Sequence, residues 1–304
     1  MAFHLDADKL TDLNSAARLV PSGGLVALGG SLSARLPMAL VRELIRLETA
    51  ELHVVGSAHS IDVDLLVAAG AIKVCEQSYV GFEQDHGLAP AFRRAAQNGE
   101  LEVRESCCDT VLTQIRAAEM GLPFLPVRGV KGTGIRELHP EYGEVTCPFT
   151  GETLVAVPAL SPDVALIHAP MGDRAGNLHL EQPYVLDERF AAGSAAVVAT
   201  VDRIVSTQEV AEAGIVIPAY RVAAVAEAPF GAHPTSAFPG YAYDRAHIAE
   251  WVRAAGTPQG AAAYLEQYVT STDEAGYRDM IGEQRMAQLR GYSDSTESWM
   301  SLYS

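Results

Sequence analysis

The chain has 304 residues, 48% of them hydrophobic, and its 38 acidic and 22 basic residues give a formal net charge of −16. This length can bury a large core, and the acidic excess argues against the basic surface that a nucleic-acid-binding protein needs. No run of 18 or more apolar residues predicts a membrane span, and the first residues lack the basic and apolar regions of a secretory signal.

The cysteines and histidines do not predict a metal site. Cys75, Cys107, Cys108 and Cys147 lack the spacing of metal ligands, and the nine histidines are scattered along the chain. The adjacent pair Cys107 and Cys108 would make a poor structural disulfide. Reduced thiols and a cytoplasmic location are the simplest account.

Apolar runs alternate with helical patterns, which predicts an α/β fold with an open mixed or parallel sheet flanked by helices. The predicted strands are Leu25–Leu28, Leu52–Gly56, Ile72–Val80, Leu101–Val103, Phe124–Val127, Thr153–Val157, Val164–His168, Ala196–Val201 and Val222–Glu227. The predicted helices are Pro37–Leu47, Ile61–Ala69, Ala89–Gln97 and Asp109–Met120. A glycine closely follows each of the last three helices, as is typical of helix C-termini.

The final third of the chain has a different pattern. Asp244–Ala255, Gly260–Val269 and Ala275–Leu289 have helical periodicity with no strand between them. We expect a helical C-terminal layer that packs on the sheet or on a partner. Residues 1–292 are predicted to form one domain, and the polar residues 293–304 a flexible tail. The stretch Arg128–Gly151 is irregular, and loops this long are usually functional or covered by a partner.

A glycine turn predicts the first part of a ligand site. Gly29, Gly30 and Ser31 close the strand Leu25–Leu28, and a helix beginning at Pro37 follows. Glycine lets the backbone approach a ligand, so we expect the N–H groups of this turn to face polar groups of a ligand at the helix N-terminus. An ordinary tight turn is the alternative. The G-x-G-x-x-G fingerprint of nicotinamide dehydrogenases is absent.

A second wall of the pocket is predicted at the end of the next strand. Ser57 and Ala58 follow Leu52–Gly56, and open α/β sheets bind ligands at the carboxyl ends of their strands. A plain loop is an equally good interpretation of this segment.

Several motifs, in order between about residues 20 and 270, resemble the α-type subunit of class I coenzyme A transferases, in particular the glutaconate CoA-transferase branch. They are Gly29–Ser31 with Pro37–Leu44, Ser78–Glu83, Gly87–Arg94, Gly121–Pro126, Val157–Ala169, Gly176–Leu178 and Glu227–Pro234.

The resemblance implies the open α/β fold of that family, which is NagB/RpiA-like, and a β-type partner subunit in an αβ or α2β2 complex. It implies transfer of coenzyme A between an acyl-CoA and a carboxylic or dicarboxylic acid. The nucleophilic glutamate would lie on the β subunit, so this chain would supply one wall of a shared site. Coenzyme A would enter as part of the substrate, and no other cofactor is implied.

One segment departs from the family pattern. Family α chains commonly carry an acidic pair, an aromatic residue, a small residue and an asparagine, where this chain has Arg104, Glu105, Ser106, Cys107 and Cys108. In the transferases an amide at the place of Cys108 helps to stabilise the tetrahedral oxyanion. A thiol is a weaker hydrogen-bond donor, so transferase chemistry is put in doubt.

The pair Arg104 and Glu105 looks like relatives that have left transferase chemistry. Some are hydrolases that open a cyclic β-diketone CoA thioester, and others are acyl-CoA decarboxylases. The resemblance implies that Glu105 is the catalytic base, because a carboxylate at a site wall can take a proton from water or from an acidic C–H. A surface ion pair between Arg104 and Glu105 is the alternative. A ligand-binding module for sugar phosphates is the non-enzymatic alternative, although no basic helical module precedes the sheet.

Overall fold

The computed structural model describes residues 8–184 and 186–291. Its strands are β1 (Leu10–Thr11), β2 (Leu25–Leu28), β3 (Leu52–Val55), β4 (Ala58–His59), β5 (Ile72–Gln77), β6 (Tyr79–Val80), β7 (Glu102–Glu105), β8 (Phe124–Val127), β9 (Gly143–Thr146), β10 (Thr153–Pro158), β11 (Val164–Gly172), β12 (Leu178–His179), β13 (Ala196–Ile204) and β14 (Val222–Glu227). Its helices are α1 (Leu13–Ala17), α2 (Met38–Arg46), α3 (Ile61–Ala68), α4 (Glu83–His86), α5 (Pro90–Asn98), α6 (Cys108–Glu119), α7 (Ile135–Leu138), α8 (Asp187–Gly193), α9 (Thr207–Ala213), α10 (Arg245–Ala254), α11 (Pro258–Leu265), α12 (Glu274–Ile281) and α13 (Glu283–Arg290).

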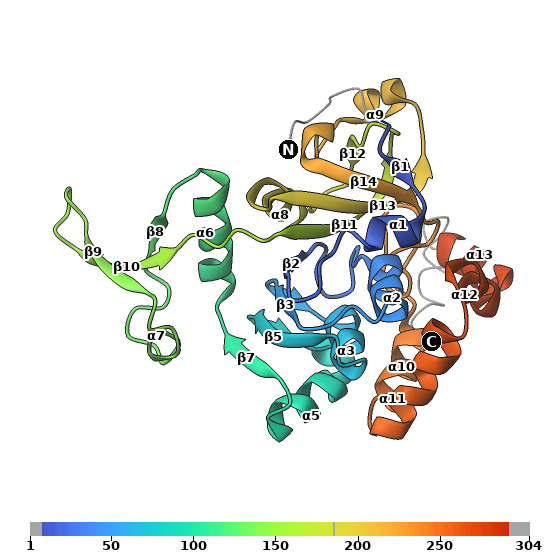
Figure 1. Ribbon diagram of the computed structural model, residues 1–304, viewed down its shortest axis with the longest axis horizontal. Coiled ribbons are helices and arrows are strands. Elements are labelled where there is room, and N and C mark those ends of the chain that lie inside the picture. Colours follow the sequence, from blue (N-terminus) through green and yellow to red (C-terminus); the bar gives the residue numbers. More distant parts are fainter. Residues whose placement is uncertain (1–7, 185, 292–304) are drawn as a thin grey trace.

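A nine-stranded sheet runs through the body of the molecule in the order β1-β14-β13-β11-β2-β3-β5-β7, with β12 beside β11 (Figure 1). Every pair in it is parallel except β11 with β12. The predicted open α/β sheet is therefore confirmed. From β2 the chain adds β3, β5 and β7 on one side of the sheet, and later adds β11, β13 and β14 on the other side of β2. The direction in which strands are added therefore reverses between β2 and β11. Such a switch point is where open α/β sheets bind ligands.

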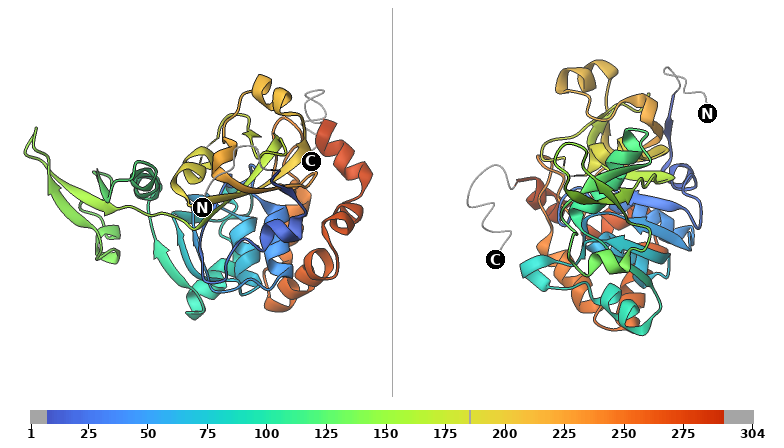
Figure 2. Two further views of the ribbon diagram at one scale, coloured as in Figure 1. Left: turned by 45° about the horizontal axis from the view of Figure 1, so that its top comes forward. Right: turned by 90° about the vertical axis from the view of Figure 1, so that its left-hand side faces the viewer.

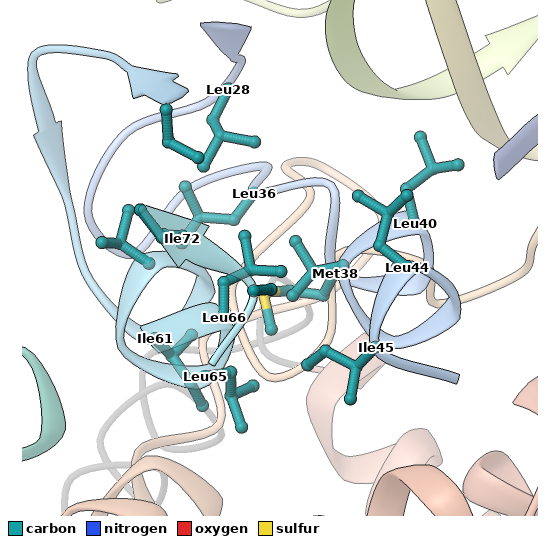
Figure 3. Close-up of a cluster of buried hydrophobic side chains, with 14 of the residues drawn as sticks. Leu28, Leu36, Met38, Leu40, Leu44, Ile45, Ile61, Leu65, Leu66 and Ile72 are labelled. Carbon is teal, nitrogen blue, oxygen red and sulfur yellow. The ribbon is translucent and has the colours of Figure 1, made fainter. Parts of the chain in front are cut away.

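Helices cover both faces of this sheet. On one face α2, α3 and α5 bury an apolar cluster that includes Leu40, Leu44, Ile61 and Leu65 (Figure 3). On the other face α6 and α8 pack over a second cluster. The apolar periodicity of α2 is the reason that it lies on the sheet, because burying one leucine stabilises the fold by about 1.5–3 kcal/mol.

The C-terminal helices form a layer outside α2 and α3 (Figures 1 and 2). Trp251 of α10 belongs to the same buried cluster as the residues of α3, and its Nε1 donates to Asp64 of α3 at 2.9 Å. The predicted helical layer is present, but it packs on helices and not on the sheet itself.

Two predicted elements are divided in the structure. The strand predicted at Ile72–Val80 ends at Gln77, and β6 pairs with β4 in a separate two-stranded ribbon. The helix predicted at Ala275–Leu289 breaks at Gly282, whose φ of +85° is left-handed and ends α12. Periodicity detected the apolar residues on both sides of each break but not the break itself.

The stretch predicted to be irregular belongs to an arm that projects from the body (Figures 1 and 2). The arm consists of the antiparallel sheet β8-β10-β9 and the short helix α7. Its own small core includes Val127, Val130, Tyr142, Val155 and Val157. The irregular stretch thus supplies α7 and β9 to a separate small layer.

The domain boundaries stay a prediction, because the expected tail, residues 293–304, lies outside the described residues. Within residues 8–184 and 186–291, no helix is long and apolar enough to cross a bilayer.

Candidate functional site

Polar side chains from three strand ends meet at the carboxyl edge of the sheet. Ser57 follows β3, Ser78 follows β5 and Cys108 follows β7, and parallel strands bring these positions to one edge. The Ser78 Oγ lies 3.3 Å from the Ser57 Oγ and 3.0 Å from the Cys108 Sγ. Two of the predicted site residues, Ser57 and Cys108, are therefore linked through a third residue.

The glycine turn lies next to this group. The Ser31 Oγ donates to the carbonyl oxygen of Ala58 at 3.0 Å, and the Leu32 N–H donates to the same oxygen at 3.0 Å. The turn after β2 and the loop after β3, predicted separately as parts of one site, are thus in direct contact.

The three N–H groups of the glycine turn have hydrogen-bond acceptors inside the chain. Gly29 donates to the Leu166 carbonyl at 2.9 Å, and Ser31 donates to the Ala34 carbonyl at 2.9 Å. Gly30 donates to the Asp187 Oδ1 at 2.8 Å. All three donors are satisfied inside the chain, and their role toward a substrate stays a prediction.

The N-terminus of the helix after the turn is covered by another segment of the chain. The Ala39 N–H, in the first turn of α2, donates to the Gly231 carbonyl at 2.8 Å, and the Arg35 N–H donates to the Ser236 carbonyl. A segment some 200 residues later in the chain covers the place where an anion would bind. The local pattern of strand, turn and helix could not reveal this cover.

Glu105 is the last residue of β7, which is the last strand of the sheet. It lies opposite Gln77 in the register with β5, and it is exposed. Its carboxylate forms no hydrogen bond or ion pair within the described residues. The Arg104 Nε instead donates to Glu102 at 2.8 Å. The alternative of an ion pair between Arg104 and Glu105 is therefore wrong.

The two adjacent cysteines have different surroundings. Cys107 is the N-cap of α6, where it forms a capping box with Thr110. Cys108 is the first residue of that helix and is exposed beside Ser78. Cys107 has a structural role, and Cys108 is the thiol that faces the carboxyl edge.

Sequence reasoning missed Ser78 as a site residue. The predicted strand ran on to Val80 and placed Ser78 inside it, whereas β5 ends one residue before Ser78. The rule that identified Ser57 would have found Ser78 if the end of the strand had been placed correctly.

It also missed a buried polar cluster below this edge. The His59 Nδ1 lies 2.6 Å from the Asp62 Oδ2, and both residues are fully buried. The His59 Nε2 and both amide atoms of Gln77 have no hydrogen-bond partner among the described residues. These side chains pack against Gly56, where a Cβ would come within 2.5 Å of the His59 Nε2 and 2.6 Å of the Gln77 Oε1. Glycine at this position lets the polar cluster form.

A pocket of ≈310 Å³ lies beside the same loops. Leu32, Ser33, Ser60, Phe82 and Tyr243 are among the residues that line it. In the part of the chain that the structure describes, no group of three or more His, Cys, Asp or Glu residues could hold a metal ion.

The fold and this edge define a class of protein. A family model described as coenzyme A transferase matches residues 10–228, so the chain belongs to the coenzyme A transferase family. The predicted membership is confirmed, and the relatives place the chain among the α-type subunits.

Two relatives illustrate the range within the family. The chain is 33% identical to the IpdA subunit of a cholesterol ring-cleaving hydrolase from Rhodococcus jostii, over 88% of this chain and 94% of the relative. It is 32% identical to a protein of unassigned function from Archaeoglobus fulgidus, over 93% of this chain, and spans 65% of that protein's length.

Solved structures agree with this assignment. The glutaconate coenzyme A-transferase of Acidaminococcus fermentans has a TM-score of 0.88 at 28% identity and is matched over 93% of this chain and 95% of its own. A variant of the decarboxylase AibA/AibB has a TM-score of 0.80 at 33% identity, over 86% of this chain and 98% of its own. The chain is thus similar to hydrolase, transferase and decarboxylase subunits.

Proposed function

We propose that this chain is the α subunit of a two-subunit enzyme that acts on acyl-CoA thioesters, and that Glu105 is its general base. The observation that carries the proposal is the position of Glu105. It stands at the carboxyl end of an edge strand, exposed and without an ion-pair partner among residues 8–184 and 186–291, three residues before the Cys108 that contacts Ser78. A carboxylate without such a partner is available to take a proton.

Hydrolysis of a C–C bond is the reaction that fits this arrangement best. Glu105 would take a proton from water while the water oxygen bonds to a ring carbonyl carbon of a cyclic β-diketone CoA thioester. Collapse of the oxyanion would break the adjacent C–C bond, and the released enolate would take the proton back from Glu105. Ser57, Ser78 and Cys108 would offer hydrogen-bond donors nearby. The similarity to the ring-cleaving hydrolase subunit supports this choice.

A related reaction is decarboxylation of an acyl-CoA, in which the same carboxyl group would deliver a proton to the carbanion that the loss of CO2 leaves. The similarity to the AibA/AibB decarboxylase supports it as a variant of the same proposal.

A β-type partner would complete the site. An active site works best when bulk solvent is excluded and only a reacting water is admitted, yet Glu105 is exposed in the single chain. Large apolar side chains are exposed on β7, just after α6 and in the arm, and exposed apolar patches mark interaction surfaces. They are Val103, Met120, Leu122, Phe124, Leu138 and Phe149, the last of which is 94% exposed.

CoA transfer is the second candidate. The match to glutaconate coenzyme A-transferase over nearly the whole of both chains favours it. In this case a glutamate of the β subunit would attack the thioester, and Glu105 would be a wall residue. The presence of Cys108 in place of an amide donor counts against it.

The test uses the purified complex of this chain with its β-type partner and a panel of acyl-CoA substrates. Glu105→Gln should lower kcat by about 10²–10⁴-fold, the usual contribution of a general base. The two subunits should still assemble into the same complex. Glu102→Gln, on the same strand, is the matched control and should retain activity. The free α chain should be inactive.

The transferase alternative gives the opposite result. Glu105→Gln would then slow the reaction less than tenfold. Hydroxylamine would cleave the enzyme–CoA thioester on the partner and so inactivate the enzyme. Wild-type rates in the Glu105→Gln complex would refute the role of Glu105 in either reaction.

A further inference from the structure

His139 connects the arm to the strand that carries Glu105. It follows α7 and is 2% exposed. Its Nε2 lies 2.8 Å from the carbonyl oxygen of Glu105, 34 residues earlier in the chain. Its Nδ1 lies 2.7 Å from the Glu141 Oε1, and its ring stacks on that of Tyr142 with centroids 4.4 Å apart and planes at 9°. These contacts fix both the place and the orientation of the ring.

The partners of His139 determine what the ring donates. A carbonyl oxygen can only accept a hydrogen bond, so the Nε2 must carry a hydrogen. Partial burial would raise the pKa of Glu141, but the hydrogen bond with His139, a backbone hydrogen bond and the nearby charges together lower this pKa below its ordinary value. The Nδ1 faces the Glu141 carboxyl group, so both ring nitrogens of His139 have a hydrogen-bond partner.

The hydrogen bond from His139 satisfies a backbone carbonyl of Glu105 that a further strand of the sheet would otherwise bond. β7 is the last strand of the sheet and pairs with β5 on one side only. Just after Glu105 the Ser106 N–H returns to the Gln77 carbonyl at 3.2 Å, and α6 begins at Cys108. A backbone group at an open edge has no ladder partner, so His139 is what holds this carbonyl.

The charged groups around the ring come from several elements. Arg136 and Glu141 lie on its own segment, and the Arg136 Nη1 is 3.4 Å from the His139 carbonyl oxygen. Arg104 on β7 interacts electrostatically with Glu141.

We propose that His139 is a positioning residue, whose bond to the Glu105 carbonyl sets where the Glu105 carboxylate stands. This inference rests on the proposed function of Glu105. It assigns a catalytic purpose to the irregular stretch: the arm carries apolar surface for a partner, and it also holds the end of the catalytic strand. A partner that docks on the arm would therefore act on the position of Glu105 through a single buried side chain.

Two substitutions separate the hydrogen bond from the packing. His139→Phe keeps a flat ring against Tyr142 and removes both ring nitrogens, with their hydrogen bonds. His139→Gln keeps a terminal N–H that can reach the Glu105 carbonyl. In the complex we expect His139→Phe to lower kcat by about 10–100-fold at an unchanged KM, as a small misplacement of a catalytic group does. His139→Gln should restore most of the rate.

His179 is a matched control. It is 8% exposed, its Nδ1 lies 2.7 Å from the Gly214 carbonyl oxygen, and its Nε2 lies 3.2 Å from Glu181. The ring thus bonds a carbonyl and a glutamate two residues later, as His139 does, but in another part of the fold. His179→Phe should cost similar stability and leave kcat unchanged. An equal loss of kcat in both phenylalanine variants would mean that His139 is only structural.

The decisive measurement combines His139→Phe with Glu105→Gln. If His139 acts through Glu105, the double variant should be no slower than Glu105→Gln alone. Additive losses would overturn the proposal and leave the role of Glu105 intact. Hydrogen exchange of the peptide 102–110 in the free chain tests the same bond without catalysis. The exchange rate should rise in His139→Phe and fall back to the wild-type rate in His139→Gln. An unchanged rate in His139→Phe would overturn the positioning role, whether or not Glu105 is the base.

Discussion

The anchoring of the C-terminal helices gives a prediction with a defined magnitude. Arg42 of α2 is 2% exposed and reaches Glu274 of α12, 232 residues later. Its Nε lies 2.9 Å from the Glu274 Oε2, and its Nη2 also bonds that carboxylate. The Nη1 donates to the His233 carbonyl at 2.8 Å, and the guanidinium lies 3.8 Å from the centre of the Tyr277 ring.

Arg42→Met should leave the buried Glu274 carboxylate without its main partner. Breaking a buried pair in this way costs roughly 3–5 kcal/mol, because one charge stays buried and uncompensated. Arg46 keeps an Nη2 3.5 Å from the Glu274 Oε2, so we expect the lower end, about 3 kcal/mol. For a chain of this size the loss corresponds to a fall in Tm of roughly 6–12 °C. The double variant Arg42→Met with Glu274→Met should be more stable than Arg42→Met alone.

Acid should weaken the same contact. Burial alone would raise the pKa of Glu274, but the charge and hydrogen bond of Arg42, together with the charges of Arg46 and Arg278, lower it below the ordinary 4.5. A lowered folded-state pKa stabilises the protein above the unfolded-state pKa, and this stability is lost as the pH falls through the folded-state value. Urea unfolding of the wild type and both variants, at pH 7 and at steps below pH 5, measures both effects. The reasoning is refuted if Arg42→Met costs less than about 0.5 kcal/mol or if the double variant is less stable than Arg42→Met.

Two further predictions concern the carboxyl edge. In the native chain iodoacetamide should label Cys108 and not Cys75, because Cys108 is exposed whereas burial raises the pKa of the Cys75 thiol; peptide mapping that finds both labelled at one rate would contradict this. Asp187→Asn should lower the free energy of unfolding in urea by roughly 3 kcal/mol, because the buried Arg35, whose Nη2 lies 2.9 Å from the Asp187 Oδ2, loses its counter-charge. An unchanged unfolding midpoint would show that this ion pair and the bond to Gly30 do not hold the glycine turn.

The sequence alone determined the type of fold and predicted the edge of the sheet at which a site would lie. The runs at Leu25–Leu28 and Val222–Glu227 are strands with the predicted bounds, because strand composition is a local property. The rule that ligands bind at the carboxyl ends of parallel strands predicted Ala58 as a site residue, whereas the glycine turn predicted Ser31 and the family resemblance predicted Cys108. The resemblance that identified the family rested on motifs of the same local kind.

Only the tertiary structure decided which groups at that edge are free. The N–H of Gly30 is used by Asp187, 157 residues later, and the Glu105 carbonyl is held by His139 from the arm. Such partners come from parts of the chain that are distant in sequence, and no periodicity encodes which of them will meet. A buried donor or acceptor has to find a partner once water is removed, and the packing of the whole chain determines which partner is within reach.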